Sequence, residues 1–183
     1  MRLMAKLVLA TVIVAFMAVT AQAQQASGFV ESFNVVSEAE VVPQLNVYVH
    51  GPLKGDFGWS VWTLTSEGWS EGYAGLTYAP AKWMEVSASL GLETADNPLR
   101  GGGSVWLGSG RWSLLSLHEH GGSGYWYRYL GTFQMTKTVV VGVNSQRFIG
   151  TGPYVQASIG KVALWGTYVI GDGRGVVGVR FNF

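Results

Sequence analysis

The stretch Gly175-Val-Val-Gly-Val-Arg-Phe-Asn-Phe183 closes the chain and decides the fold. Successive residues of a β-strand point to opposite faces of a sheet. One face of this segment is therefore apolar and the other polar, with Val177, Val179, Phe181 and Phe183 on the first and Gly178, Arg180 and Asn182 on the second. Such a strand suits a sheet whose outer face contacts lipid and whose inner face contacts water.

This final aromatic residue, with apolar residues at every second position before it, resembles the C-terminal strand of bacterial outer-membrane β-barrel proteins. The resemblance is to the broad class and singles out no family within it. It implies location in the outer membrane of a Gram-negative cell and contact with outer-membrane lipid. It also implies recognition by the outer-membrane assembly machinery through the C-terminal strand.

The opposite end of the chain has the features of a secretory signal peptide. Arg2 and Lys6 form a positive n-region, Leu7 to Val19 is an apolar run, and Ala21-Gln22-Ala23 provides an A-x-A cleavage site. An N-terminal membrane anchor is the alternative, but the run is short for a span that needs about 20 apolar residues. We therefore predict cleavage and export.

Removal of residues 1–23 leaves residues 24–183 as one outer-membrane β-barrel domain. The leader holds two of the twelve Lys and Arg residues and none of the eleven Asp and Glu residues, so the mature net charge is −1. This balance gives no basic footprint, and we predict no nucleic-acid partner. The chain has no cysteine, and nothing in it indicates a cofactor. Its 26 glycines exceed the usual share of about 7% and, with eight Trp and eight Tyr, suit a barrel.

Apolar and polar residues alternate after almost every turn signal, which predicts an all-β, antiparallel up-and-down transmembrane barrel. Glycine, proline, Asn and Asp punctuate the alternation and delimit eleven strands from about Val41 onward. Single-chain barrels of this kind normally have an even number of strands. Phe29 to Val36 is therefore predicted to be the first of twelve strands, and ten strands is the alternative. The last strand should run toward the periplasm, with both chain termini at that end.

If the bulky apolar face points outward, polar and charged side chains point into the barrel. The predicted pore-lining residues are Glu85, Arg128, Asn144, Gln146, Gln156, Lys161 and Arg180. Charges on an inner face are tolerated where water or opposite charges reach them. They form either a salt-bridged lining that holds the barrel together or the lining of a pore that sets its solute preference. Trp126 and Trp165 share the inward parity and would narrow the lumen, stack on a solute or simply pack.

His118-Glu-His120 is the one chemically suggestive cluster. Both imidazoles share one face of a strand, where they could meet a metal ion or, with Ser116 or Ser123, form a nucleophile–base pair. No third metal ligand is identifiable, so no metal site is assigned. A polar strand end at the outer rim is the preferred explanation of the cluster.

Two other patterns have structural explanations. Gly101-Gly-Gly103 is not followed by the strand–loop–helix context of a phosphate loop, so we expect a bend or turn there. Trp59, Trp69, Trp83 and Trp112 lie near predicted strand ends, where interfacial girdles place aromatic residues.

These observations predict a small passive pore for polar solutes, without catalytic residues. The alternatives are a non-conducting structural or partner-docking barrel of the outer membrane and a lipid-modifying enzyme that uses His118 or His120. A soluble secreted barrel would expose apolar patches that favour aggregation.

Overall fold

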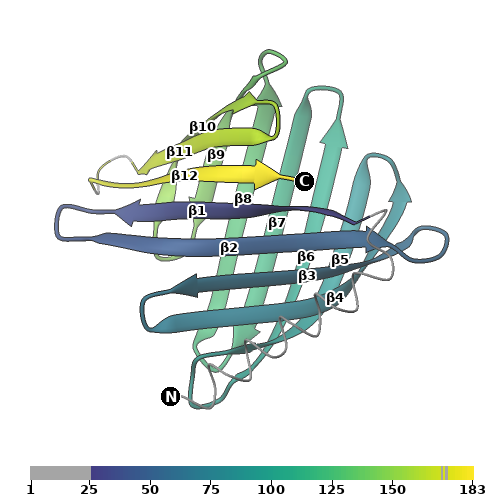
Figure 1. The fold of residues 1–183 in the computed structure, drawn as a ribbon, viewed down its shortest axis with the longest axis horizontal. Helices are drawn as coiled ribbons and strands as arrows, with labels where there is room; N and C mark the ends of the chain where they lie inside the picture. The colour runs from purple at the N-terminus through teal and green to yellow at the C-terminus, as the bar shows by residue number, and fades with distance from the viewer. Residues whose placement is uncertain (1–25, 170, 172) are drawn as a thin grey trace.

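A closed barrel of twelve antiparallel strands forms the whole described structure, a computed structural model that covers residues 26–169, 171 and 173–183 (Figure 1). The predicted signal peptide lies outside these residues. No helix in the described part of the chain is long and apolar enough to cross a membrane. The strands are β1 Ser27–Val36, β2 Val41–Pro52, β3 Phe57–Ser66, β4 Trp69–Ala81, β5 Met84–Glu93, β6 Leu99–Ser109, β7 Trp112–Gly121, β8 Gly124–Gln134, β9 Val139–Gln146, β10 Gly150–Ile159, β11 Val162–Val169 and β12 Arg174–Asn182.

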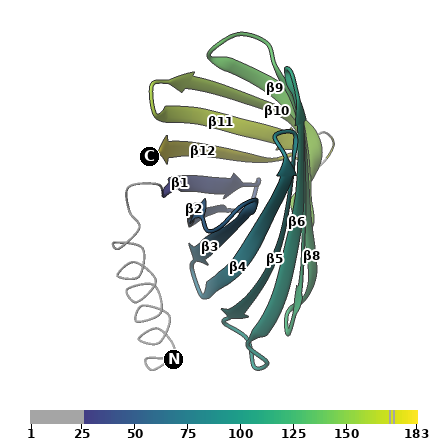
Figure 2. The same ribbon diagram turned by 90° about the vertical axis from the view of Figure 1, so that its right-hand side faces the viewer.

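Every strand pairs with its sequence neighbours, and β1 pairs with β12 to close the barrel. In this closing pair Val30 lies opposite Phe181 and Glu31 lies opposite Arg180. Figure 2 shows β1 and β12 side by side, with β5, β6 and β8 across the interior. The prediction of twelve strands, the first of them formed by Phe29 to Val36, is confirmed, and the ten-strand alternative is wrong.

The up-and-down order gives the barrel two distinct ends. We call the end that contains Ser27, Phe183 and the turns β2–β3, β4–β5, β6–β7, β8–β9 and β10–β11 the terminal end. The opposite end, with the turns β1–β2, β3–β4, β5–β6, β7–β8, β9–β10 and β11–β12, is the distal end. The strands are strongly inclined, since β1, β2, β3 and β12 run across β5 to β8 in Figure 1.

Most turns are short and fall where glycine allows a tight reversal. Gly68 and Gly160 adopt positive φ angles of 72° and 58°, which a side chain rarely permits. One expectation is wrong: Gly101-Gly-Gly103 belongs to β6 and forms no bend.

Bulky apolar side chains cover the outside of the barrel. Leu90 is 69% exposed and Leu164 is 59% exposed, although both lie in the middle of paired strands. The same pattern continues around the wall at Leu45, Leu76, Leu114, Val143, Val155 and Val177. A continuous apolar exterior of this kind is what a lipid-facing barrel presents.

Polar and aromatic side chains fill the inside. Glu31 and Asn144 are the largest fully buried side chains, 0% and 1% exposed respectively. A buried cluster that includes Phe33, Tyr154 and Trp165 packs beside them. The barrel is therefore inverted relative to a soluble domain, with its polar groups at the centre.

Candidate functional site

A cavity of about 330 Å³ occupies the distal half of the barrel interior. Its mouth includes Ser66, Ser123 and Arg147, which lie in or beside distal turns. Its wall combines aromatic rings from Phe33, Trp62, Trp69, Trp126 and Trp165 with polar groups from Gln44, Asn46, Arg100, Arg128 and Gln146 and one acidic group, Glu71. Concave sites with apolar walls and a few convergent polar groups are where proteins bind small molecules.

Arg128 of β8 is a half-buried arginine without a carboxylate partner. Its Nε donates a hydrogen bond to Oδ1 of Asn144 at 2.9 Å, and its guanidinium carbon lies 5.7 Å from the ring centroid of Trp165. Among the described residues no carboxylate lies within ion-pair distance of Arg128. Its direct contacts are a neutral amide and an aromatic ring, while Glu31, which is paired with Arg180, acts on it from beyond ion-pair distance.

Three buried polar atoms of the cavity wall have no hydrogen-bond partner in the described structure: Nη2 of Arg128, Nε1 of Trp165 and Oδ1 of Asn46. A buried donor or acceptor without a hydrogen-bond partner lowers the stability of a fold by about 1–3 kcal/mol, so such atoms are uncommon and need an explanation. Two are N–H donors and one is an acceptor. All three atoms are almost fully shielded from solvent, so an oxygen-rich solute in the cavity would reach them only after the surrounding side chains move.

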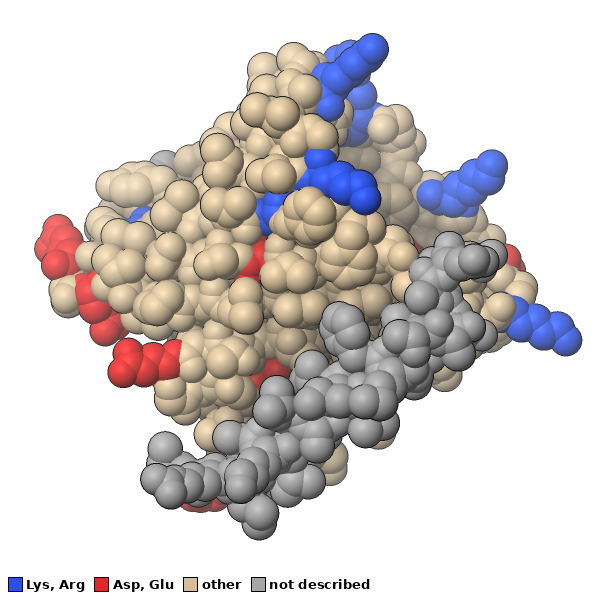
Figure 3. All heavy atoms as spheres, in the orientation of Figure 1, with Lys and Arg blue, Asp and Glu red and all other residues tan. Residues whose placement is uncertain are grey.

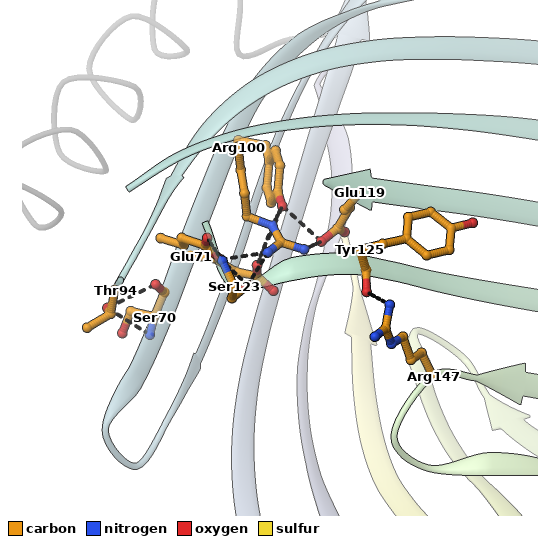
Figure 4. Close-up of polar contacts among 10 residues, drawn as sticks. Ser70, Glu71, Thr94, Arg100, Glu119, Ser123, Tyr125 and Arg147 are labelled. Atoms are coloured by element: carbon orange, nitrogen blue, oxygen red, sulfur yellow. Dashed lines mark hydrogen bonds and ion pairs between the residues drawn. The ribbon is translucent and has the colours of Figure 1, made fainter. Parts of the chain in front are cut away.

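Arg100 of β6 is the opposite case, a buried arginine with three carboxylates around it (Figure 4). Its Nη1 lies 2.6 Å from Oε2 of Glu93, its Nη2 lies 3.3 Å from Oε2 of Glu119, and its Nε lies 3.5 Å from Oε2 of Glu71. The hydroxyl of Tyr73 accepts from Nε at 2.5 Å and donates to Glu119 at 2.8 Å. We call these five residues the Arg100 cluster.

The β7–β8 turn and two glycines support the Arg100 cluster. The backbone N–H of Ser123 donates to Oε1 of Glu93 at 2.7 Å, which ties the distal turn to the cluster. A Cβ on Gly91 would lie 2.6 Å from the ring of Tyr73, and a Cβ on Gly102 would lie 3.4 Å from the same ring. Glycine is therefore required at 91 to make room for the tyrosine inside the barrel.

Arg180, a predicted pore-lining residue, is engaged in an ion pair across the closing strands. Its Nη2 lies 2.6 Å from Oε1 of Glu31, and Asn46 donates to Oε2 of the same carboxylate at 3.1 Å. The guanidinium carbon of Arg180 also lies 4.4 Å from the ring centroid of Phe29. This layer lies across the middle of the lumen, next to the cavity floor formed by Asn46 and Arg128.

The other predicted lining residues lie at different depths. Gln146 lines the distal cavity with Arg128, and Asn144 is buried beneath it. Gln156 accepts from the hydroxyl of Tyr154 at 2.8 Å, on the inner face of β10. Glu85 is on the inner face of β5 near the terminal end, opposite Trp106. Lys161 is exposed in the β10–β11 turn, so it belongs to the terminal rim and not to the strand wall.

His118 lies on the outer face of β7, together with Ser116 and His120, while Glu119 between the histidines points inward. Ser116 Oγ is 2.8 Å from Nε2 of His118, and the hydroxyl of Tyr125 is 2.5 Å from Nδ1 of the same ring. Among the described residues no group of three or more His, Cys, Asp or Glu side chains is arranged to hold a metal ion.

Sequence reasoning missed most of the charged interior. Glu31, Glu71, Glu93, Arg100 and Glu119 are all buried. Strand parity could have identified Glu119 as an inward-facing residue. Glu119 lies between His118 and His120, so its side chain points to the opposite face of the strand from theirs. The girdle prediction for Trp69 is wrong, since Trp69 lines the cavity. Trp69 lies two residues before Glu71 in β4, so both side chains point into the barrel. This strand alternation, and not the position of Trp69 at a strand end, decides which face it occupies.

Comparison with known proteins supports the fold. The structure of the KdgM porin matches with a TM-score of 0.60 and 12% identity, over 85% of this chain and 99% of that chain. The KdgM porin in complex with disordered oligogalacturonate matches with a TM-score of 0.60 and 13% identity over the same shares. The NanC porin matches with a TM-score of 0.51 and 9% identity, over 85% and 98%. No family model and no curated protein matches the sequence. The chain thus has the porin fold, and the predicted resemblance to outer-membrane β-barrels is confirmed.

Proposed function

We propose that this protein is a passive outer-membrane pore for polar solutes and that it favours anionic ones. The observation that carries the proposal is the cavity floor, where Arg128, Trp165 and Asn46 hold unpartnered buried polar atoms next to a charge without a counter-ion. Once the surrounding side chains move, a solute with carboxylate and hydroxyl oxygens would satisfy both the two donors and the acceptor.

The middle layer of the lumen would act as the constriction. Twelve strands are intermediate between barrels whose interior is filled by side chains and barrels with a wide aqueous channel. Arg180, Glu31, Arg128 and Asn144 narrow the path below the cavity, and charges of both signs there would order the passage of a hydrated solute. The apolar exterior supports the location in a membrane, and the predicted orientation would place the terminal end in the periplasm.

The structural neighbours point to the same solute class. One of them is the KdgM porin in complex with disordered oligogalacturonate, a chain of sugar acids. The aromatic wall of the present cavity, with Trp62, Trp69 and Trp126, offers flat apolar surfaces beside the donors of its floor. A sugar acid combines a ring with apolar faces and a carboxylate, so it suits this arrangement.

The test is single-channel recording on the chain without residues 1–23, refolded into planar bilayers. We expect open steps with a reversal potential on the anion side and transient block by oligogalacturonate, whereas a neutral oligosaccharide of equal length blocks less. Arg128→Met should lower both the anion preference and the block. Arg174→Gln, which removes an exposed charge at the distal end, is the matched control and should change neither.

Two results would contradict the proposal at different levels. A folded and inserted barrel that never opens would rule out the pore. If Arg128→Met still gives open steps and its ion selectivity is unchanged, the protein is a pore but Arg128 does not determine its selectivity.

A second candidate function rests on the contacts of His118 with Ser116 and Tyr125. Serine, a histidine base and a group that orients the histidine form the general arrangement of a covalent hydrolase, and here it faces outward on an apolar surface. The N–H groups of β7 are engaged with β6 and β8, so the strand supplies no evident oxyanion donor. Labelling by a fluorophosphonate, abolished in Ser116→Ala, would support this lipid-hydrolase function, and absence of labelling would reject it.

A further inference from the structure

Each of the five turns at the terminal end carries one lysine or arginine, and together they form a ring of positive charge around that rim. We call this set the basic ring; its members are Lys54, Lys82, Arg111, Lys137 and Lys161. All five side chains are exposed. Asp56 is the one acidic residue in the same five turns. None of the five forms an ion pair with another residue in the described part of the chain. Their charge is therefore available to a partner.

The distal end is mixed and more acidic. Its turns carry the exposed acidic residues Glu38, Glu40, Glu67 and Asp96, and its two cations are Arg147 and Arg174. Figure 3 shows the separation directly: blue Lys and Arg side chains project along the upper and right edges, whereas red Asp and Glu side chains gather at the left. A random placement of surface charge would mix the two signs. The net charge of the whole molecule is close to zero, so the basic ring is a local feature of one rim.

Exposed apolar side chains accompany each member of the basic ring. Within three residues of each cation stands at least one large apolar residue that is exposed; examples are Phe57, Trp83, Trp112, Met135 and Ile159. The aromatic residues pair with neighbours, since Phe57 lies 4.9 Å from Tyr78 and Trp112 lies 4.5 Å from Phe133 between ring centroids. Aromatic girdles mark the level of lipid headgroups, and long basic side chains reach from the edge of the apolar zone into that level.

We propose that the basic ring binds the phosphate groups of anionic phospholipids in the leaflet that surrounds the terminal end. The charges stand where the apolar exterior ends, which is the depth of the phosphates, and they point outward from separate turns around the whole rim. One anionic lipid per turn fits this spacing better than one extended partner. The inference rests on the proposed location in a membrane and is independent of conduction.

The positions of the tryptophans allow a selective test. Trp62, Trp69, Trp106, Trp126 and Trp165 lie on inner faces of their strands. The remaining three, Trp59, Trp83 and Trp112, lie on the outer face or in a turn, and all three are at the terminal end. Quenching of tryptophan fluorescence by lipids with brominated acyl chains therefore reports on the lipids next to the basic ring.

The experiment uses the full barrel refolded into vesicles of phosphatidylcholine with a minor fraction of phosphatidylglycerol. Two sets of vesicles differ in which of the two lipids is brominated. Near an anionic membrane surface each cation favours binding by about fivefold, so brominated phosphatidylglycerol should quench several-fold more than its mole fraction predicts. The variant with Lys54→Gln, Lys82→Gln, Arg111→Gln, Lys137→Gln and Lys161→Gln should quench in proportion to mole fraction.

A charge-preserving variant is the matched control, in which Lys54→Arg, Lys82→Arg, Lys137→Arg and Lys161→Arg retain the preference. Quenching in proportion to mole fraction by the native barrel would overturn the inference and leave the pore intact. The inference would also be overturned if the neutralised variant kept its preference for the anionic lipid. It would likewise be overturned if neutralisation changed only the anion selectivity of conductance. No quenching by either brominated lipid would overturn the membrane location itself, so the two failures are distinguishable.

Discussion

Arg100 and Arg128 both point into the same barrel, but Arg100 is buried, Arg128 is half-buried, and their surroundings differ. Arg100 is surrounded by Glu71, Glu93 and Glu119, with every nitrogen of its guanidinium engaged. Arg128 has one amide partner, Asn144, and one nitrogen with no partner in the described structure. The Arg100 cluster contains three carboxylates for one guanidinium. The guanidinium of Arg128, in contrast, has no carboxylate within ion-pair distance.

The difference separates stability from function. A buried charge that is fully paired stabilises one arrangement of the wall, and its removal leaves its partners uncompensated. A buried charge without a counter-ion costs stability and is expected where a ligand completes it. The Arg100 cluster is thus the structural side of the lumen and the Arg128 site is the binding side. Four substitutions test this division.

Arg100→Met should have the largest effect. It leaves three carboxylates buried together without a cation, and breaking a buried pair in this way costs about 3–5 kcal/mol. The midpoint of urea unfolding in lipid vesicles, followed by tryptophan fluorescence, measures the loss. An unfolding midpoint like that of the native barrel would show that the carboxylates find other partners and would end the contrast with Arg128.

Tyr73→Phe should weaken the same cluster without changing its charge. The tyrosine hydroxyl accepts from Arg100 and donates to Glu119, so its loss leaves two buried polar groups short of a partner and costs about 1–3 kcal/mol. Tyr154→Phe is the control, because that hydroxyl donates to Gln156 alone. Equal unfolding midpoints in the two variants would argue against a special role for the Arg100 cluster.

Gly91→Ala should disturb the seat of Tyr73. The added Cβ would lie 2.4 Å from the carbonyl oxygen of Gly72 and 2.6 Å from the tyrosine ring, and overpacking of this kind costs about 1–3 kcal/mol. Gly131→Ala is the matched control in β8, where a Cβ would meet nothing within 4 Å. Thermal unfolding of both variants in the same detergent measures the difference between their unfolding temperatures. Equal unfolding temperatures would show that the Tyr73 ring can move away from the added Cβ.

Arg128→Met should have the smallest effect on stability, below about 1 kcal/mol. The lost hydrogen bond to Asn144 is offset because an unpaired half-buried charge is removed and an apolar side chain of similar length replaces it. Urea unfolding of this variant beside Arg100→Met gives the comparison in one experiment. A loss as large as that of Arg100→Met would mean that Arg128 also holds the wall together.

The sequence allowed the fold to be predicted because each strand carries its own two-residue alternation. Leu90 and Leu92 identify the outer face of β5, and the same rule places Arg128 and Asn144 inside. The pairing of Phe29 to Val36 with the last strand followed from the even number of strands. These inferences need only local patterns and one general rule of closure.

The interior could not be predicted to the same depth, since parity gives the side of a residue and not its neighbours. Arg100 and Glu119 are brought together by the register between β6 and β7, and Glu71 joins them from β4. The register depends on turn lengths and strand stagger, which the alternation leaves open. Lys161 shows the related limit at a strand end, where the choice between wall and rim depends on a single residue.

The ion pair between Glu31 and Arg180 joins residues 149 positions apart, whereas every other strand pairing links neighbours along the chain. Hairpins form from local contacts, while the seam between β1 and β12 requires both ends of the chain to meet. We therefore expect closure of the seam to be slower than formation of the hairpins, and a sheet left open at this seam would expose two unpaired edges. The ion pair between Glu31 and Arg180 would hold this seam closed. Its electrostatic attraction becomes strongest once the last strand has paired and water is excluded from the lumen.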